Sequence, residues 1–281
     1  MSLRYFPLET TDYRLTMGLK ALKDRSWLEV DTNYSQDIAE KQRLLAAHPD
    51  SVYGETDGTY AAQRHILELV QTELTNFRTD ISKRSLHPTE PPLIAAAKLV
   101  QEDLVLMRKQ GTDYVLAAAC VCFPTGWNLI EKVGQTIRHI HRPVPGLNNQ
   151  IGMSIDKFFD RLKPGRIVER FNWGLYDSAA LFQAGWWRAE RPVNRAISPE
   201  NIGEKIHFRV ERQTLQRLAD TPDILFSIRI FNTPLAEVVE TPERAAQLDH
   251  ALRTMPKDML EYKSIRRYEG LIQDYVSQAS R

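Results

Sequence analysis

The chain has 281 residues and a formal net charge of +1, and its basic residues are spread along the whole length. This balance disfavours nucleic acid or an acidic membrane surface as a partner. No apolar run approaches the roughly 20 residues of a membrane span, and the first ten residues lack the apolar core of a signal peptide, so we expect a cytoplasmic protein. Its two cysteines, Cys120 and Cys122, are too few for a four-cysteine iron–sulfur cluster.

The first half of the chain is predicted to be mostly helical. Apolar residues recur at helical spacing over residues 62–77 and again over 93–107. The continuous apolar stretch from Tyr114 to Phe123 has the length of a buried strand, and a Pro-Thr-Gly turn ends it. We therefore expect two amphipathic helices followed by a buried strand.

The second half is predicted to hold short helices, then strands, then helices again. Helices are expected over residues 130–140 and 155–162, the second capped by Ser154. Three strands follow, over residues 167–176, 206–218 and 224–231. Near the end, Thr241–Pro242 opens one helix and Met255–Pro256 opens a longer one. Strands grouped in succession indicate an α+β fold with an antiparallel sheet, flanked by N- and C-terminal helices.

Familiar cofactor and hydrolase motifs are missing from the sequence. It contains no G-x-G-x-x-G or P-loop, and no H-E-x-x-H, G-x-S-x-G or Cys/His zinc pattern. These absences disfavour a built-in NAD, FAD or ATP site and the common hydrolase mechanisms.

The segment "HIHRPVPG" at residues 139–146 places two histidines before two prolines and a glycine. Prolines fix their own φ angles, so an imidazole here could serve as a well-positioned ligand. The alternative is a helix that ends in a polar turn, where histidine suits the C-terminal dipole. The stretch alone leaves both interpretations open.

The predicted strands over residues 206–218 and 167–176 carry polar side chains on faces that could belong to a site. Arg212 shares a strand face with Phe208 and Val210, which indicates either an internal ion pair or a bound anion. In the strand before it, Arg170, Asn172 and Tyr176 share one face, while the alternate residues are apolar. The polar face of that strand could line a pocket.

Seven motifs in a fixed order resemble the haem-dependent oxidative N-demethylase alpha-subunit family over roughly residues 5–270. They are "MGLKAL" (17–22), "WLEVD" (27–31), "EDLVLM" (102–107), "CFPTGW" (122–127), "IHRPVPG" (140–146), "FNWGLYD" (171–177) and "RVERQTLQRL" (209–218). Each is weak alone, and together they are specific.

The resemblance implies a PAS-type domain that binds haem b and oxidises dimethylamine with dioxygen. A reductase that carries flavin and an iron–sulfur cluster would supply electrons. We expect an N-terminal helical extension over residues 1–110, a PAS-like haem-binding core over 111–235 with short helices inserted in its antiparallel sheet, and C-terminal helices over 236–281. Two other functions are retained: a haem-based gas sensor, and a binding module without haem.

The resemblance also implies roles for particular residues. His141 becomes the favoured axial ligand of the iron, with His139 and His207 as alternatives. Guanidinium groups grip carboxylates with two hydrogen bonds, so the three arginines Arg170, Arg212 and Arg229 are candidate partners of the haem propionates.

A small cationic amine needs a carboxylate or neutral acceptors around it. Glu211, Asn172 and Tyr176 lie in family-like motifs and are the candidate amine contacts. The sequence departs from the family pattern at Gly174, where we expect a small hydroxyl residue in many relatives, and this departure puts an identical substrate specificity in doubt.

Overall fold

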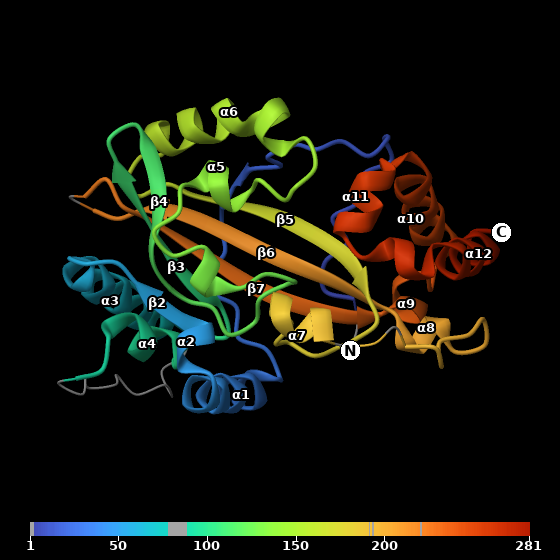
Figure 1. Cartoon of the computed structure of the whole chain (residues 1–281), viewed down its shortest axis with the longest axis horizontal. Coiled ribbons are helices and arrows are strands. Elements are labelled where there is room, and N and C mark those ends of the chain that lie inside the picture. Colours follow the sequence, from blue (N-terminus) through green and yellow to red (C-terminus); the bar gives the residue numbers. More distant parts are fainter. Residues whose placement is uncertain (1–2, 78–88, 191, 193, 220) are drawn as a thin grey trace.

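The computed structural model describes residues 3–77, 89–190, 192, 194–219 and 221–281. Within these residues, seven strands form one antiparallel sheet in the order β1-β5-β6-β7-β3-β4-β2 (Figure 1). The strands are β1 Lys20–Ala21, β2 Tyr53–Glu55, β3 Asp103–Gln110, β4 Asp113–Cys120, β5 Ile167–Tyr176, β6 His207–Arg217 and β7 Ile224–Pro234. The predicted α+β class is confirmed.

Helices surround this sheet. Those before β5 are α1 Tyr34–Ala47, α2 Pro49–Val52, α3 Tyr60–Phe77, α4 Pro92–Ala97, the 3₁₀ turn η1 Leu129–Glu131, α5 Ile137–Ile140 and α6 Leu147–Arg161. Those after β5 are α7 Gly185–Glu190, α8 Ile202–Lys205, α9 Leu235–Val238, α10 Pro242–Thr254, α11 Lys257–Tyr262, the 3₁₀ turn η2 Ile265–Tyr268 and α12 Glu269–Ala279.

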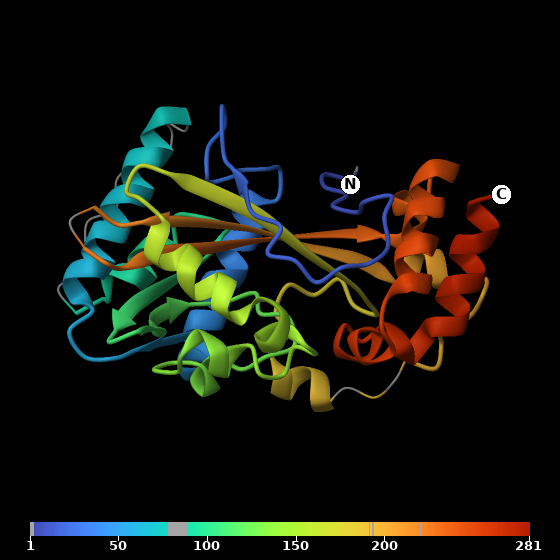
Figure 2. The same ribbon diagram turned by 90° about the horizontal axis from the view of Figure 1, so that it is seen from above.

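The central strands have the PAS-like arrangement expected from the sequence. The β3–β4 hairpin comes first, α5 and α6 follow, and β5, β6 and β7 complete the sheet, with the last strand paired to the first of the hairpin. Figure 2 shows the red C-terminal helices at one end of the sheet and the blue-cyan helix α3 at the other. The C-terminal helices α10 to α12 pack at one end, as predicted.

The strands of the second half agree closely with their prediction. β5 covers residues 167–176 as expected, while β6 and β7 differ from it by a few residues at their ends. The long β5–β6 register places Asn172 opposite Glu211 and Arg170 opposite Gln213. Directly opposed residues point to the same face, so this pairing brings the predicted site residues together.

The helix predicted over residues 93–107 is wrong in its second half. The helix α4 ends at Ala97, and β3 begins at Asp103 between β4 and β7. Leu104 to Met107 are all buried because both faces of this inner strand are covered. A strand covered on both faces shows no alternation, so its apolar run resembles the stripe of a buried helix.

Three further helix predictions need correction. The expected helix over 130–140 is the separate η1 and α5, because Gly134 lies between them with a φ of +76°. Ser154 is not a cap, since α6 begins at Leu147 after a left-handed Gly146. The longer helix expected after Pro256 ends at Tyr262, and Ser264 takes a left-handed conformation before η2. By contrast, Thr241 caps α10 as predicted, accepting a hydrogen bond from the Arg244 amide.

The position of β3 also bears on the predicted division of the chain. β3 precedes residue 111 in sequence, yet it pairs with β4 and β7 inside the sheet. The boundaries at 110 and 235 stay predictions. Across the described ranges, the structure holds no helix with both the length and the apolar character needed to cross a membrane.

Candidate functional site

The polar face of β5 and β6 forms the centre of the candidate site. Arg170 and Asn172 of β5 lie on the same face as Gln213 and Glu211 of β6. Because successive side chains of a strand point to opposite faces, Arg212 points away from this group. The sequence analysis grouped Arg170 with Asn172 on β5, and the structure adds Glu211 and Gln213 of β6 to this group.

His141 follows α5 and lies within electrostatic reach of Arg170. Its Nδ1 lies 2.9 Å from the Ile137 carbonyl oxygen, so Nδ1 donates and Nε2 keeps its lone pair. Burial lowers the pKa of His141, and the positive charge of Arg170 lowers it further. The imidazole is consequently neutral, fixed in orientation and able to act as a ligand through Nε2.

The other two candidate histidines are placed less favourably. His139 is exposed on α5. His207 begins β6 and its Nδ1 contacts the carbonyl oxygen of Lys205. His207 lies opposite Tyr176, on the same face of the sheet as Glu211, and burial lowers its pKa too. Within the described residues, the structure gives it no contact with Arg170 or Glu211.

The positive charge of Arg170 interacts with both His141 and Glu211. In the described part of the chain, its guanidinium also has a donor without a hydrogen-bond partner. Its Nε is buried without a hydrogen-bond partner among the described residues. Burial lowers the pKa of its guanidinium, while the negative charge of Glu211 opposes that shift. A buried guanidinium with open donors favours an anion beside it.

Within the described residues, the hydrogen bonds of Glu211 all reach one of its two carboxylate oxygens. Its Oε2 accepts hydrogen bonds from Gln213 Nε2 at 2.7 Å and from Asn172 Nδ2 at 3.4 Å. The Asn172 Oδ1 in turn accepts a hydrogen bond from Lys263 Nζ at 2.9 Å. Within the described part of the chain, no hydrogen bond reaches Glu211 Oε1, which leaves that oxygen available to a ligand.

A groove opens next to this face. It has a volume of about 390 Å³ and is lined by residues of the N-terminal segment, of the turn after His141 and of α11, among them Tyr13, Pro145, Gln150 and Met259. Tyr13 also acts electrostatically on Arg170. Tyr13 is therefore the residue that links the groove to Arg170, while the polar-face residues themselves are not among its described lining.

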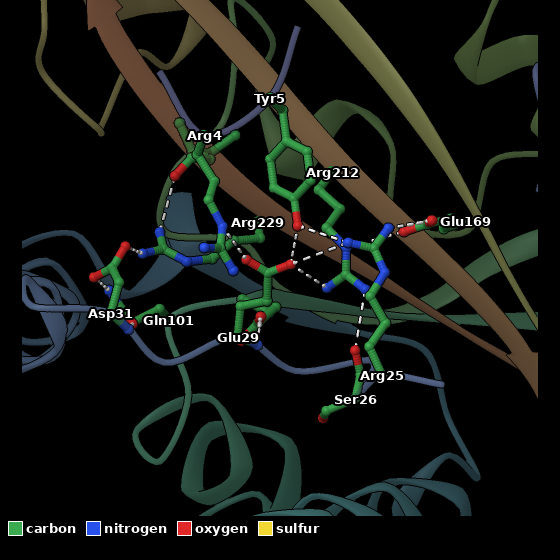
Figure 3. A network of polar contacts seen from close by, with 12 residues as sticks. Arg4, Tyr5, Arg25, Ser26, Glu29, Asp31, Gln101, Glu169, Arg212 and Arg229 are labelled. Atoms are coloured by element: carbon green, nitrogen blue, oxygen red, sulfur yellow. Dashed lines mark hydrogen bonds and ion pairs between the residues drawn. The ribbon is translucent and has the colours of Figure 1, made fainter. Parts of the chain in front are cut away.

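Arg212 and Arg229 lie elsewhere, in a network with the N-terminal segment (Figure 3). Arg212 forms ion pairs with Glu169 at 3.1 Å and Glu29 at 3.3 Å. Arg229 pairs with Asp31 at 2.7 Å. The internal ion pair considered for Arg212 is confirmed. The structure does not bring these two arginines to His141, and of the three arginines only Arg170 stays at the candidate site.

The family model for haem-dependent oxidative N-demethylase, alpha subunit-like, matches residues 18–273. The chain belongs to this family. The resemblance recognised in the motifs is thereby confirmed over most of the chain, and the protein is an oxidoreductase whose chemistry depends on haem.

The residues on the polar face fit the haem that membership of the N-demethylase family implies. His141 offers a free imidazole nitrogen on a segment held by its own backbone hydrogen bond. Arg170 offers an unsatisfied buried guanidinium where a propionate would need a cationic partner. The buried Arg170 donor without a partner costs stability unless an anion accepts a hydrogen bond from it.

The sequence analysis did not identify Lys263 as a site residue in this N-demethylase family member. Its side chain contacts Asn172 on the polar face of β5 and β6. The residue closes α11 in the stretch "EYKS", where a lysine reads as an exposed helical residue. It is 5% exposed, and its Nζ also donates to the Trp173 carbonyl. No local pattern identifies it, because its burial follows from how α11 packs on β5.

Gly174 shapes the position of Tyr176. A Cβ built on Gly174 would lie 2.8 Å from both the Cε2 and the hydroxyl oxygen of Tyr176, so the ring folds over the bare glycine. A side chain at position 174 would exclude the ring from this place. The effect of Gly174 on substrate specificity stays a prediction.

Gly174→Ala is expected to displace the Tyr176 ring without unfolding the protein. The clash involves the far end of a side chain, so the ring swings away at a cost of about 1–3 kcal/mol. We expect the KM for the amine substrate to change several-fold while haem content stays the same. Steady-state kinetics measure the KM, the Soret absorbance measures haem content, and thermal unfolding checks that the fold persists. An unchanged KM would separate Tyr176 from the substrate pocket.

Proposed function

We propose that this chain binds haem b and oxidatively demethylates a small secondary amine such as dimethylamine, using dioxygen in a monooxygenase-type reaction. A separate reductase with flavin and iron–sulfur centres supplies the electrons. The observation that supports this most directly is the grouping of a neutral ligand-ready histidine, an open arginine and a half-free carboxylate on one face of the sheet in a family member.

In this proposal two residues hold the cofactor. His141 would ligate the haem iron through Nε2, and Arg170 would pair with a propionate. Bound haem supplies the redox-active iron that dioxygen chemistry requires. The neutral state of His141 matters because a protonated imidazole cannot donate a lone pair to a metal.

Glu211, Asn172 and Tyr176 hold the amine. A secondary amine is protonated near neutral pH, and the open Oε1 of Glu211 accepts one of its N–H groups. Loss of the ammonium proton exposes the nitrogen lone pair, and the same carboxylate is placed to take that proton. The Tyr176 ring lies against Gly174 at the end of the polar face. The ring would limit the size of the N-substituents.

Electron supply gives the proposed function a specific test. Reduced haem-loaded protein mixed with dimethylamine and dioxygen is expected to give at most about half a formaldehyde per haem, because a monooxygenase-type demethylation takes two electrons from a donor and one reduced iron supplies only one. Adding a partner reductase with its nicotinamide donor should restore repeated turnover. Formaldehyde is measured by derivatisation, and haem by its Soret absorbance.

The same experiment separates the alternatives. Sustained formaldehyde production from NADPH without a reductase would contradict the need for a partner. Haem binding with no formaldehyde in any condition would favour the gas sensor. Absence of a Soret band after expression with a haem precursor would contradict the cofactor assignment itself.

A further inference from the structure

The side chain of Lys263 is buried in an unusual setting. Lys263 is 5% exposed, and within the described ranges no carboxylate oxygen lies within 4.0 Å of its Nζ. Its partners are the Asn172 side chain, the Trp173 carbonyl and the Trp173 ring, whose centroid lies 5.3 Å from Nζ. Burying an ammonium without a paired carboxylate costs several kcal/mol, so a purely structural role would favour an apolar residue.

The backbone around Lys263 is also held in a rare conformation. Ser264, the next residue, has a φ of +61°, a region that residues other than glycine rarely occupy. This left-handed turn ends α11, and the Ser264 amide donates to the Glu261 carbonyl. Strained backbone persists where surrounding structure fixes it, and here it directs Lys263 toward β5.

The hydrogen bonds of Lys263 fix the orientation of Asn172. An ammonium only donates, so the atom 2.9 Å from Lys263 Nζ must be the amide oxygen of Asn172. The Asn172 amide nitrogen is thereby directed at Glu211 Oε2, 3.4 Å away. Gln213 donates to the same oxygen from the other side. With Oε2 held by two donors, Oε1 of Glu211 is turned away from them.

We propose that Lys263 is a positioning residue for the substrate amine, acting through Asn172 to present the open oxygen of Glu211. The inference rests on the proposed function in that Glu211 receives the amine. Lys263 itself touches neither haem nor substrate.

The charged groups that act on Lys263 are Glu211 of β6, which stabilises its ammonium, and Arg170 of β5, which opposes it. Burial lowers the pKa of Lys263 to about 8, so its donor strength changes within an accessible range of pH.

A double-mutant cycle on haem-loaded protein tests this relay. Lys263→Met keeps the length of the side chain and removes the donor, and we expect dimethylammonium binding by calorimetry to weaken by about tenfold. Glu211→Gln should weaken it more, and the double variant should match Glu211→Gln alone within about twofold, because both act through one carboxylate. Lys257→Met, on the exposed start of α11, is the matched control and should bind normally.

Additive losses in the cycle, or normal binding in Lys263→Met, would overturn the proposal. A second measurement does not depend on the substrate. The side-chain amide ¹⁵N resonance of Asn172 is expected to titrate near pH 8 in the wild type and to stay constant in the Lys263→Met variant. A resonance that does not move in the wild type would also overturn it. If the wild type fails to bind dimethylamine, the proposed substrate fails, and the Asn172 titration still decides the role of Lys263.

Discussion

Replacing His141 by alanine is expected to abolish stoichiometric haem binding while the protein stays folded. Of the three candidate histidines, His141 is the one whose ring is oriented by a carbonyl of its own helix and whose pKa the charge of Arg170 lowers. His141 caps a four-residue helix and is incompletely buried, so its removal should lower the free energy of unfolding by only about 1 kcal/mol. The Soret absorbance per polypeptide, together with circular dichroism, measures both effects.

His139→Ala is the matched control for this variant. It removes an exposed imidazole two residues away on the same short helix and should retain full haem content. His207→Ala tests the third candidate at the start of β6. Full haem binding by the His141 variant, with loss in either of the others, would reassign the axial ligand.

Lys41→Met is expected to lower the free energy of unfolding by about 3–5 kcal/mol. Lys41 and Asp103 are 0% exposed, and their charged atoms lie 3.3 Å apart. The Asp103 carboxylate also accepts hydrogen bonds from the amides of Cys122 and Phe123, which anchors the end of β4 to β3. Removing the lysine leaves a buried carboxylate without its counter-charge. Urea unfolding at neutral pH measures the loss, and Lys23→Met, at an exposed position, should show none.

The loss in Lys41→Met should depend on pH in a defined direction. Burial raises the pKa of Asp103 and Lys41 opposes that rise, so the variant carries a still higher pKa in the folded state. A raised carboxyl pKa destabilises the fold where the unfolded chain is ionised, and the penalty disappears below the unfolded value. The difference from wild type is therefore expected to shrink between about pH 7 and pH 4. A constant difference over this range would contradict a charge-based origin.

Local patterns in the sequence determined most of the secondary structure of the second half. Alternation identified β5, and apolar runs with turn residues identified β6 and β7. The threonine and proline before α10 marked a helix start that the structure confirms. The segment around His141 and the polar face of β5 were also visible, because they depend on residues close together in the chain. The order of the motifs indicated the family.

Only the tertiary structure decided the features that depend on contacts between distant segments. β3 is a strand because β4 and β7 pair with both its edges, a fact that its uniformly apolar sequence does not encode locally. Arg212 pairs with Glu29 and Glu169, which no spacing rule connects. Lys263 reaches Asn172 across 91 positions of sequence, since α11 folds back onto β5. Whether a charged side chain is a surface residue, an internal ion pair or part of a site is set by what packs around it, and burial of that kind is a property of the whole fold.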